Sequence, residues 1–151
     1  MQLVKFQEAE MQMMELLKKV TAASGFTHAA GVEVVAADVG QVTMELAKKP
    51  ELLQFNGFFH GGVIAGLADH SAGAAATTTL APGKIAVTVD LHINYLAPAN
   101  GEKITAVAQC VQSGSTLCVV SVSVSTTRDR ETAACAMATV TLRVVDMPRI
   151  A

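Results

Sequence analysis

The sequence GVIAGLADHSAGAAATTT, residues 62–79, decides the fold of this chain. Small and apolar residues occupy nearly all of its positions, and Asp69 and His70 stand near its middle. A helix on a protein surface carries charge along one side, whereas a helix that is apolar almost all round is buried. We therefore expect a buried central helix whose small side chains let other elements pack closely against it.

The segments on both sides of this helix have the alternating pattern of strands. Two strand-like segments, 32–35 and 42–46, precede it on either side of a turn at 38–40. Four more follow it, separated by short turns, at 85–96, 103–111, 117–125 and 134–145. Short connections between the last four predict that they are antiparallel neighbours. The order predicts an α+β hotdog fold, in which a long antiparallel sheet wraps around one buried helix.

Strand 85–96 alternates strictly in sequence. Successive side chains of a strand point to opposite faces. We therefore expect one face to carry Val87, Val89, Leu91, Ile93 and Tyr95, and the other to carry Thr88, Asp90, His92 and Asn94.

The first 25 residues predict an additional amphipathic helix. Between 4 and 23, apolar residues recur at spacings of three, four and seven, with Glu and Lys between them. Ser24-Gly25 follows, and glycine suits the left-handed position past a helix end. We expect a single hotdog domain over 1–151, with its core at 31–146 and the extra helix at 1–25.

Composition narrows the class of protein. The 151 residues are 51% hydrophobic and 16% charged, whereas about 25% is typical for charged residues, so self-association is expected. The net charge is −2, and Lys and Arg are scattered, which argues against nucleic-acid binding. Long apolar runs typical of membrane spans or signal peptides are not found, which predicts a cytoplasmic protein. Cys110, Cys118 and Cys135 have no metal-site spacing and are expected to be small buried hydrophobes.

Two features point to chemistry. His60-Gly61-Gly62 stands where the central helix starts, and the free N–H groups of a helix start suit a developing oxyanion. A tight loop before a helix would give the same glycines. Asp69 is costly to bury without a function, although a hydrogen bond to backbone or access to solvent would also explain it. It follows Gly61 by eight residues, about 12 Å along a helix, so two antiparallel helices across a dimer interface would be needed to join the two.

The sequence QFNGFFHGGVIAGLAD, residues 54–69, resembles the signature of the PaaI-like, phenylacetate-pathway type of hotdog acyl-CoA thioesterase. That signature has Asn or Gln six residues before His-Gly-Gly, and then Leu-Ala/Val-Asp on the same helix. The sequence VTVDLHINYLAPA, residues 87–99, resembles the next strand of the family. The resemblance extends over about 31–145. It implies hydrolysis of aryl- or short- to medium-chain acyl-CoA, in a homodimer or homotetramer, with no cofactor and no metal.

The resemblance also implies a role for each matching residue. Gly61 would donate its N–H to the thioester oxygen, and Gln54 would orient the thioester or the attacking water. Asp69 of the opposite subunit would be nucleophile or general base. His60, Gly62 and Thr88 would contact the substrate, Thr88 by holding the hydrolytic water.

Other assignments are weaker. His70 points about 100° away from Asp69 on a helix, so a His-Asp dyad is not expected. The chain has no G-x-S-x-G, G-x-G-x-x-G or Walker motif. Basic residues near loops could meet coenzyme A phosphates or simply be solvated: Lys48, Lys49, Lys84, Arg128 and Arg130.

Two alternatives to hydrolysis remain at this point. A non-catalytic hotdog module that binds or senses acyl-CoA would keep the fold and release no thiol. A hotdog dehydratase or hydratase would pair a catalytic His with an acid, in a local pattern that this chain does not contain.

Overall fold

The computed structural model describes residues 1–148, and three helices and six strands form its framework. The helices are α1 (Gln2–Ala23), α2 (Gly25–Ala30) and α3 (Gly61–Thr77), with a 3₁₀ turn, η1, at Pro50–Leu52. The strands are β1 (Glu33–Asp38), β2 (Gln41–Ala47), β3 (Lys84–Tyr95), β4 (Lys103–Ser113), β5 (Leu117–Arg128) and β6 (Glu131–Asp146). No helix in this part of the chain is long and apolar enough to cross a membrane.

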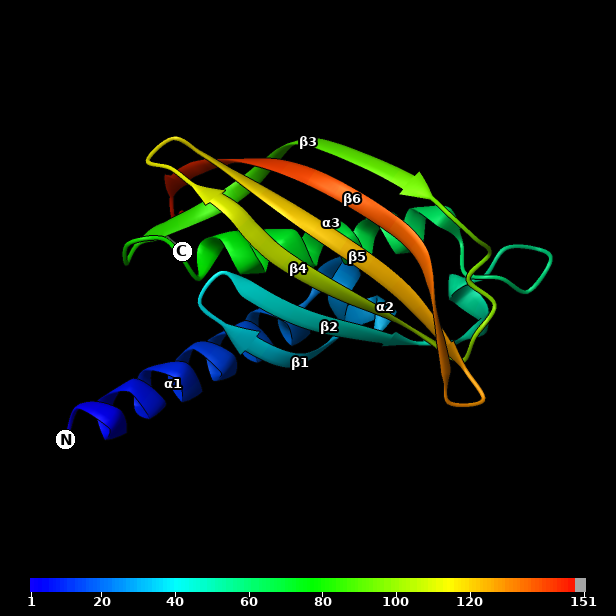
Figure 1. The fold of residues 1–151 in the computed structure, drawn as a ribbon, viewed down its shortest axis with the longest axis horizontal. Coiled ribbons are helices and arrows are strands. Elements are labelled where there is room, and N and C mark those ends of the chain that lie inside the picture. The colour runs from blue at the N-terminus through cyan, green and yellow to red at the C-terminus, as the bar shows by residue number, and fades with distance from the viewer. Residues whose placement is uncertain (149–151) are drawn as a thin grey trace.

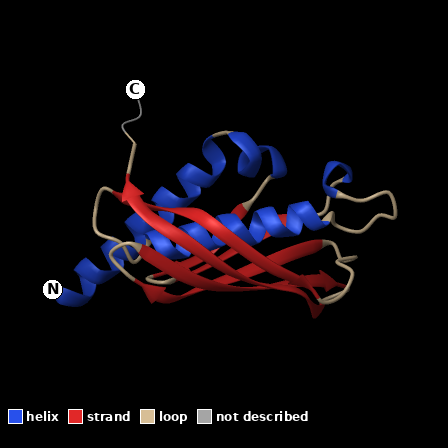
Figure 2. Ribbon diagram, turned by 90° about the horizontal axis from the view of Figure 1, so that it is seen from above, coloured by secondary structure: helices blue, strands red, loops and turns tan. Residues whose placement is uncertain are grey.

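All six strands form one antiparallel sheet in the order β1-β2-β4-β5-β6-β3. The sheet curves around α3, which lies along one of its faces, while α1 extends away from the body (Figures 1 and 2). This arrangement confirms the predicted hotdog fold.

The core lies between α3 and the inner face of the sheet. Leu67, Ala68, Ala72 and Ala75 of α3 are completely buried. They belong to one cluster with buried side chains of β2, β4, β5 and β6, among them Met44, Ile104, Val120 and Val140. The side of α3 turned away from the sheet is only partly covered, because Gly62 is exposed and Asp69, His70 and Gly73 are half-buried. The helix is therefore buried on its sheet side rather than all round.

The expectation that the last four strands are sequential neighbours is wrong for β3 and β4. Strand β3 pairs with β6 at one edge of the sheet, while β4 pairs with β2. The connection between them, residues 96–102, is held at its centre by a hydrogen bond of 2.9 Å from Phe59 N to Ala99 O. That contact ties the connection to the loop before α3, and β4 then continues beside β2.

The strict alternation expected along β3 is also wrong. Thr88 pairs with Leu142 and Asp90 pairs with Thr141, so Val89 is an extra residue in a β-bulge. A bulge lets two residues of one strand oppose one residue of its partner, which reverses the facing of the side chains beyond it. Ala86, Leu91 and Ile93 consequently all pack against the core. In a regular strand, Ala86 and Leu91 would face opposite sides, because they are five residues apart.

The N-terminal helix has the predicted position but leaves its apolar residues largely uncovered. Phe6, Leu16 and Val20 are exposed, whereas Met14 and Leu17 pack against the core. Gly25 has the left-handed φ of +77° expected after a helix. The short helix α2, which starts there, was not predicted.

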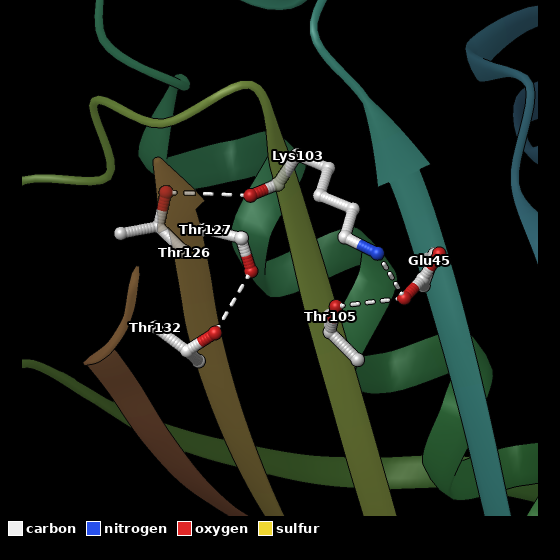
Figure 3. A network of polar contacts seen from close by, with 6 residues as sticks. All are labelled: Glu45, Lys103, Thr105, Thr126, Thr127 and Thr132. Carbon is white, nitrogen blue, oxygen red and sulfur yellow. Dashed lines mark hydrogen bonds and ion pairs between the residues drawn. The ribbon is translucent and has the colours of Figure 1, made fainter. Parts of the chain in front are cut away.

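A group of polar contacts joins β2 to β4 and β5 to β6 (Figure 3). Glu45 accepts hydrogen bonds from Lys103 at 2.7 Å and Thr105 at 3.3 Å. Its neighbours Met44 and Leu46 are buried, so Glu45 lies on the face of the sheet opposite α3. These contacts support the sheet and are separate from the features of α3.

Replacing Gly101 by Ala is expected to destabilise the fold by about 1–3 kcal/mol, the range for forcing atoms into a packed site. Gly101 is buried, and a Cβ there would collide with the backbone of Thr127 and the hydroxyl of Thr126. Denaturant unfolding measures the change. Ser115→Ala, in the exposed turn between β4 and β5, is the control. It should be neutral or stabilising, and equal effects of the two changes would contradict this account.

Candidate active site

The start of α3 presents an unused backbone donor. The helix begins at Gly61, and His60 caps it by accepting a hydrogen bond of 2.9 Å from Gly62 N at its Nδ1. His60 Nδ1 is therefore the unprotonated ring nitrogen. Among residues 1–148, no acceptor bonds the N–H of Gly61. A free N–H at a helix start, reinforced by the helix dipole, is suited to bind an oxygen that gains negative charge.

A hollow of about 440 Å³ lies beside this donor. Its lining is mostly apolar, with one amide and one phenol: Gln54, Phe59, Gly61, Ile64, Tyr95, Leu96, Ala97, Pro98 and Ala99. Gln54 Nε2 donates to Phe59 O at 3.2 Å, which fixes its amide group on the wall of the hollow. The structure thus brings Gln54 and Gly61 together on the wall of one hollow, and their catalytic roles stay predictions.

Tyr95 is the residue of this site that sequence reasoning missed. Its hydroxyl donates to Gly61 O at 2.7 Å, and its ring lies over Gly61, where a Cβ would stand 3.3 Å from Cζ. The sequence offered one signal, since Tyr95 is the only tyrosine of the chain. The assumed alternation of β3 put Tyr95 and Thr88 on opposite faces, which hid their common relation to α3.

Asp69 lies two turns further along α3 and contacts β3. It is half-buried, and its Oδ1 accepts a hydrogen bond of 2.7 Å from Thr88 Oγ1. The bond orients the carboxylate and leaves Oδ2 without a protein donor within residues 1–148. A hydroxyl that donates its proton can still accept from water, so the predicted role of Thr88 stays a prediction.

His70, the neighbour of Asp69, is directed to the N-terminal helix instead. Its Nε2 lies 2.9 Å from Thr21 Oγ1, and Thr21 is buried. Burial lowers the pKa of His70, and the carboxylate of Asp69 opposes that shift in part. His70 therefore connects α3 to α1 and forms no dyad with Asp69.

The structure separates the predicted site into two halves within one chain. Gln54, Gly61 and His60 gather at the start of α3, whereas Asp69 and Thr88 lie about 12 Å further along the helix. Of the basic residues, Lys49 donates to Ala29 O and Lys84 pairs with Asp146 at 2.6 Å.

Comparisons with known proteins agree with this fold. A family model described as the thioesterase superfamily matches residues 56–133, just over half of the chain. A 1,4-dihydroxy-2-naphthoyl-CoA hydrolase from Listeria monocytogenes is 29% identical over 90 residues, which cover 60% of this chain and 73% of that protein. A putative esterase from Halobacterium salinarum is 36% identical over 105 residues, covering 66% and 68%.

A solved structure of a related protein has a similar fold. The crystal structure of a thioesterase family protein from Silicibacter pomeroyi has a TM-score of 0.85 at 27% identity, covering 91% of this chain and 99% of that one. The chain therefore belongs to the thioesterase superfamily and is a thioester hydrolase.

The lowered pKa of His70 makes stability depend on pH. Because the folded protein disfavours the charged imidazole, the unfolded chain takes up this proton first as the pH falls below 6.5. The free energy of unfolding should therefore fall from pH 7.5 to pH 5.5, and less so in His70→Gln. Denaturant unfolding at both pH values tests this. His28→Gln, at an exposed histidine, should keep the wild-type dependence, and a His70→Gln protein that also kept it would refute the account.

Proposed function

We propose that this protein hydrolyses acyl-CoA thioesters at a site shared by two subunits, with Gly61 of one subunit opposite Asp69 of the other. One observation carries the proposal. A free N–H at the start of α3 and an oriented carboxylate lie on the same helix, about 12 Å apart. They are too far apart to act on one carbonyl, and two antiparallel α3 helices would join them in two equivalent sites.

The surface of the single chain supports such a pair. The side of α3 that the sheet leaves open carries Gly62, Ala65 and Gly73 beside Asp69, whereas Gly66 lies under the ring of Phe26. Small residues let two backbones approach closely. Strand β3 ends the sheet with one side unpaired, and its Val87 and Val89 are exposed. A long exposed edge strand with apolar side chains readily pairs with another chain.

In the proposed reaction, the thioester carbonyl oxygen accepts the hydrogen bond of Gly61 N–H, and Gln54 orients the thioester or water. Asp69 of the opposite subunit either removes a proton from water or attacks the carbonyl carbon itself. The C–S bond breaks, the sulfur takes up the proton that water releases and leaves as the thiol of CoA, and the remaining hydroxide of that water becomes the hydroxyl of the acid. Thr88 orients the carboxylate and accepts a hydrogen bond from the attacking water.

We further propose aryl or short- to medium-chain acyl groups as substrates and a PaaI-like type. The mostly apolar lining of the hollow beside Gly61 supports this, as does the aryl-CoA in the name of the Listeria relative. We also propose that the protein is a homotetramer and that it works in the cytoplasm. The apolar residues of α1 that remain exposed in the single chain support the association beyond a dimer. A non-catalytic acyl-CoA sensor is the alternative, but the oriented Asp69 carboxylate favours catalysis.

Replacing Asp69 by Asn should lower kcat by about 10²-fold or more, the scale expected for losing a positioned base. Release of free thiol from a panel of aryl- and aliphatic-CoA thioesters measures the effect. Asp38→Asn, at the exposed end of β1, is the matched control and should retain wild-type turnover. A wild-type protein that binds these thioesters without releasing thiol would instead be the sensor.

Mixed oligomers test whether the site is shared. A heterodimer of one Asp69→Asn subunit and one Gln54→Ala subunit would contain one intact site and one doubly altered site. Co-expression with two different tags isolates it, and it should recover about half of wild-type turnover under two-fold symmetry. If both residues acted within one chain, each site would keep one defect, and the heterodimer would be as inactive as its parents.

A further inference from the structure

We propose that Tyr95 is a positioning residue for the oxyanion donor, and that β3 thereby aligns both halves of the catalytic apparatus on α3. This inference rests on the proposed function. It concerns a residue that contacts the backbone next to the donor.

Tyr95 and His60 hold the two ends of one peptide group. The hydroxyl of Tyr95 donates to Gly61 O at 2.7 Å, and His60 Nδ1 accepts from Gly62 N at 2.9 Å. The carbonyl of Gly61 and the N–H of Gly62 belong to the same peptide plane, so the two bonds fix its rotation. The free N–H of Gly61 belongs to the preceding peptide, on the other side of the same Cα. That peptide is held at its own carbonyl, because His60 O accepts from Val63 N at 2.9 Å and from Ile64 N at 3.1 Å. Tyr95 and His60 hold the plane that follows, and they thereby limit rotation between the two planes at Gly61.

Glycine at position 61 increases the effect of this constraint. It has the widest conformational freedom of any residue, so the angle between the two peptide planes that meet at its Cα is less restricted by the residue itself. The ring of Tyr95 supplies a second restraint, because a Cβ at position 61 would stand 3.3 Å from both Cζ and Oη. Tyr95 therefore leaves little room for a Cβ at this position and also limits the motion of Gly61. Preorganised donors contribute strongly to catalysis because they need no reorganisation during the reaction.

The bulge at Val89 gives Tyr95 and Thr88 the same facing. The two residues are seven positions apart, so regular alternation would put them on opposite faces of β3. The extra residue reverses the facing after Thr88. Thr88 then reaches Asp69 at 2.7 Å and Tyr95 reaches Gly61 at 2.7 Å. One strand thus orients the carboxylate and the oxyanion donor, which belong to different sites in the proposed dimer.

Tyr95→Phe tests the proposal, because it removes the hydroxyl and keeps the ring. Complete loss of an oxyanion donor costs about 10²–10³ in kcat. A donor that is present but misdirected should lose only part of this contribution. We therefore expect kcat to fall about tenfold, with KM within about twofold of wild type. A donor that acts mainly in the transition state lowers kcat and kcat/KM equally. Thr127→Val is the control, since it removes a hydrogen-bonded hydroxyl between β5 and β6 and should leave both constants unchanged.

A binding measurement separates positioning from general damage. Phenacyl-CoA keeps a carbonyl but has a methylene before sulfur and cannot be hydrolysed. Its Kd should be within about twofold in wild type and Tyr95→Phe. Because Tyr95 is the only tyrosine, 3-fluorotyrosine gives a single ¹⁹F resonance, which should shift when phenacyl-CoA binds to the wild-type protein.

The outcomes are distinct. A tenfold loss of kcat with KM, Kd and melting temperature preserved supports the positioning role. Unchanged kcat overturns the positioning role and leaves the proposed function intact. A lower kcat together with weaker binding of phenacyl-CoA and a lower melting temperature also overturns it, because that pattern marks a purely structural residue. If the wild type releases no thiol from any substrate of the panel, the proposed function fails, and this inference fails with it.

Discussion

The packing of α3 against the inner face of the sheet is the contact on which the rest of the molecule depends. Leu67, Ala68, Ala72 and Ala75 are completely buried there. Because most of these side chains are methyl groups, the strands can approach the helix closely on the sheet side. Close packing also fixes the helix rotation, since interiors tolerate little free volume. That rotation decides which residues the sheet covers and leaves Gly62, Asp69 and Gly73 on the open side.

A helix held in this way imposes a distance as well as an orientation. The rise of about 1.5 Å per residue puts Gly61 and Asp69 about 12 Å apart, whatever their side chains do. Rigidity that holds each group accurately also prevents them from meeting within one chain. The same constraint explains the precise orientation of each half, and under the proposed function it makes a second subunit necessary. The low charge content of the chain, 16%, agrees with the subunit interface that the proposed function requires.

Much of the fold could be predicted from the sequence because it depends on strong local patterns. The apolar run at 62–79 marked α3, the glycines marked its start, and the hotdog fold followed from the element order. The pairing of β3 with β6 could not be predicted, because connection length favours neighbours and says nothing of the contact between Phe59 and Ala99 that redirects the chain. The pairing of Thr88 with Asp69 was equally hidden, since it depends on a bulge. The division of the site into two halves was foreseen from helix geometry alone, whereas the roles of its residues remain predictions.

The bulge at Val89 shows why periodicity fails at such a place. Val87-Thr88-Val89-Asp90-Leu91 alternates perfectly in sequence, so a regular strand would satisfy the pattern and put Val87 and Val89 on the same face as Leu91. The structure exposes both valines and turns Leu91 towards the core. Burying Leu91, Ile93 and Ala86 on one side outweighs the exposure of two smaller valines at the sheet edge, particularly if a second chain covers them. The bulge also lets Thr88 and Tyr95 both contact α3. The place where β3 departs from regular alternation is therefore the place that makes both contacts with the proposed site possible.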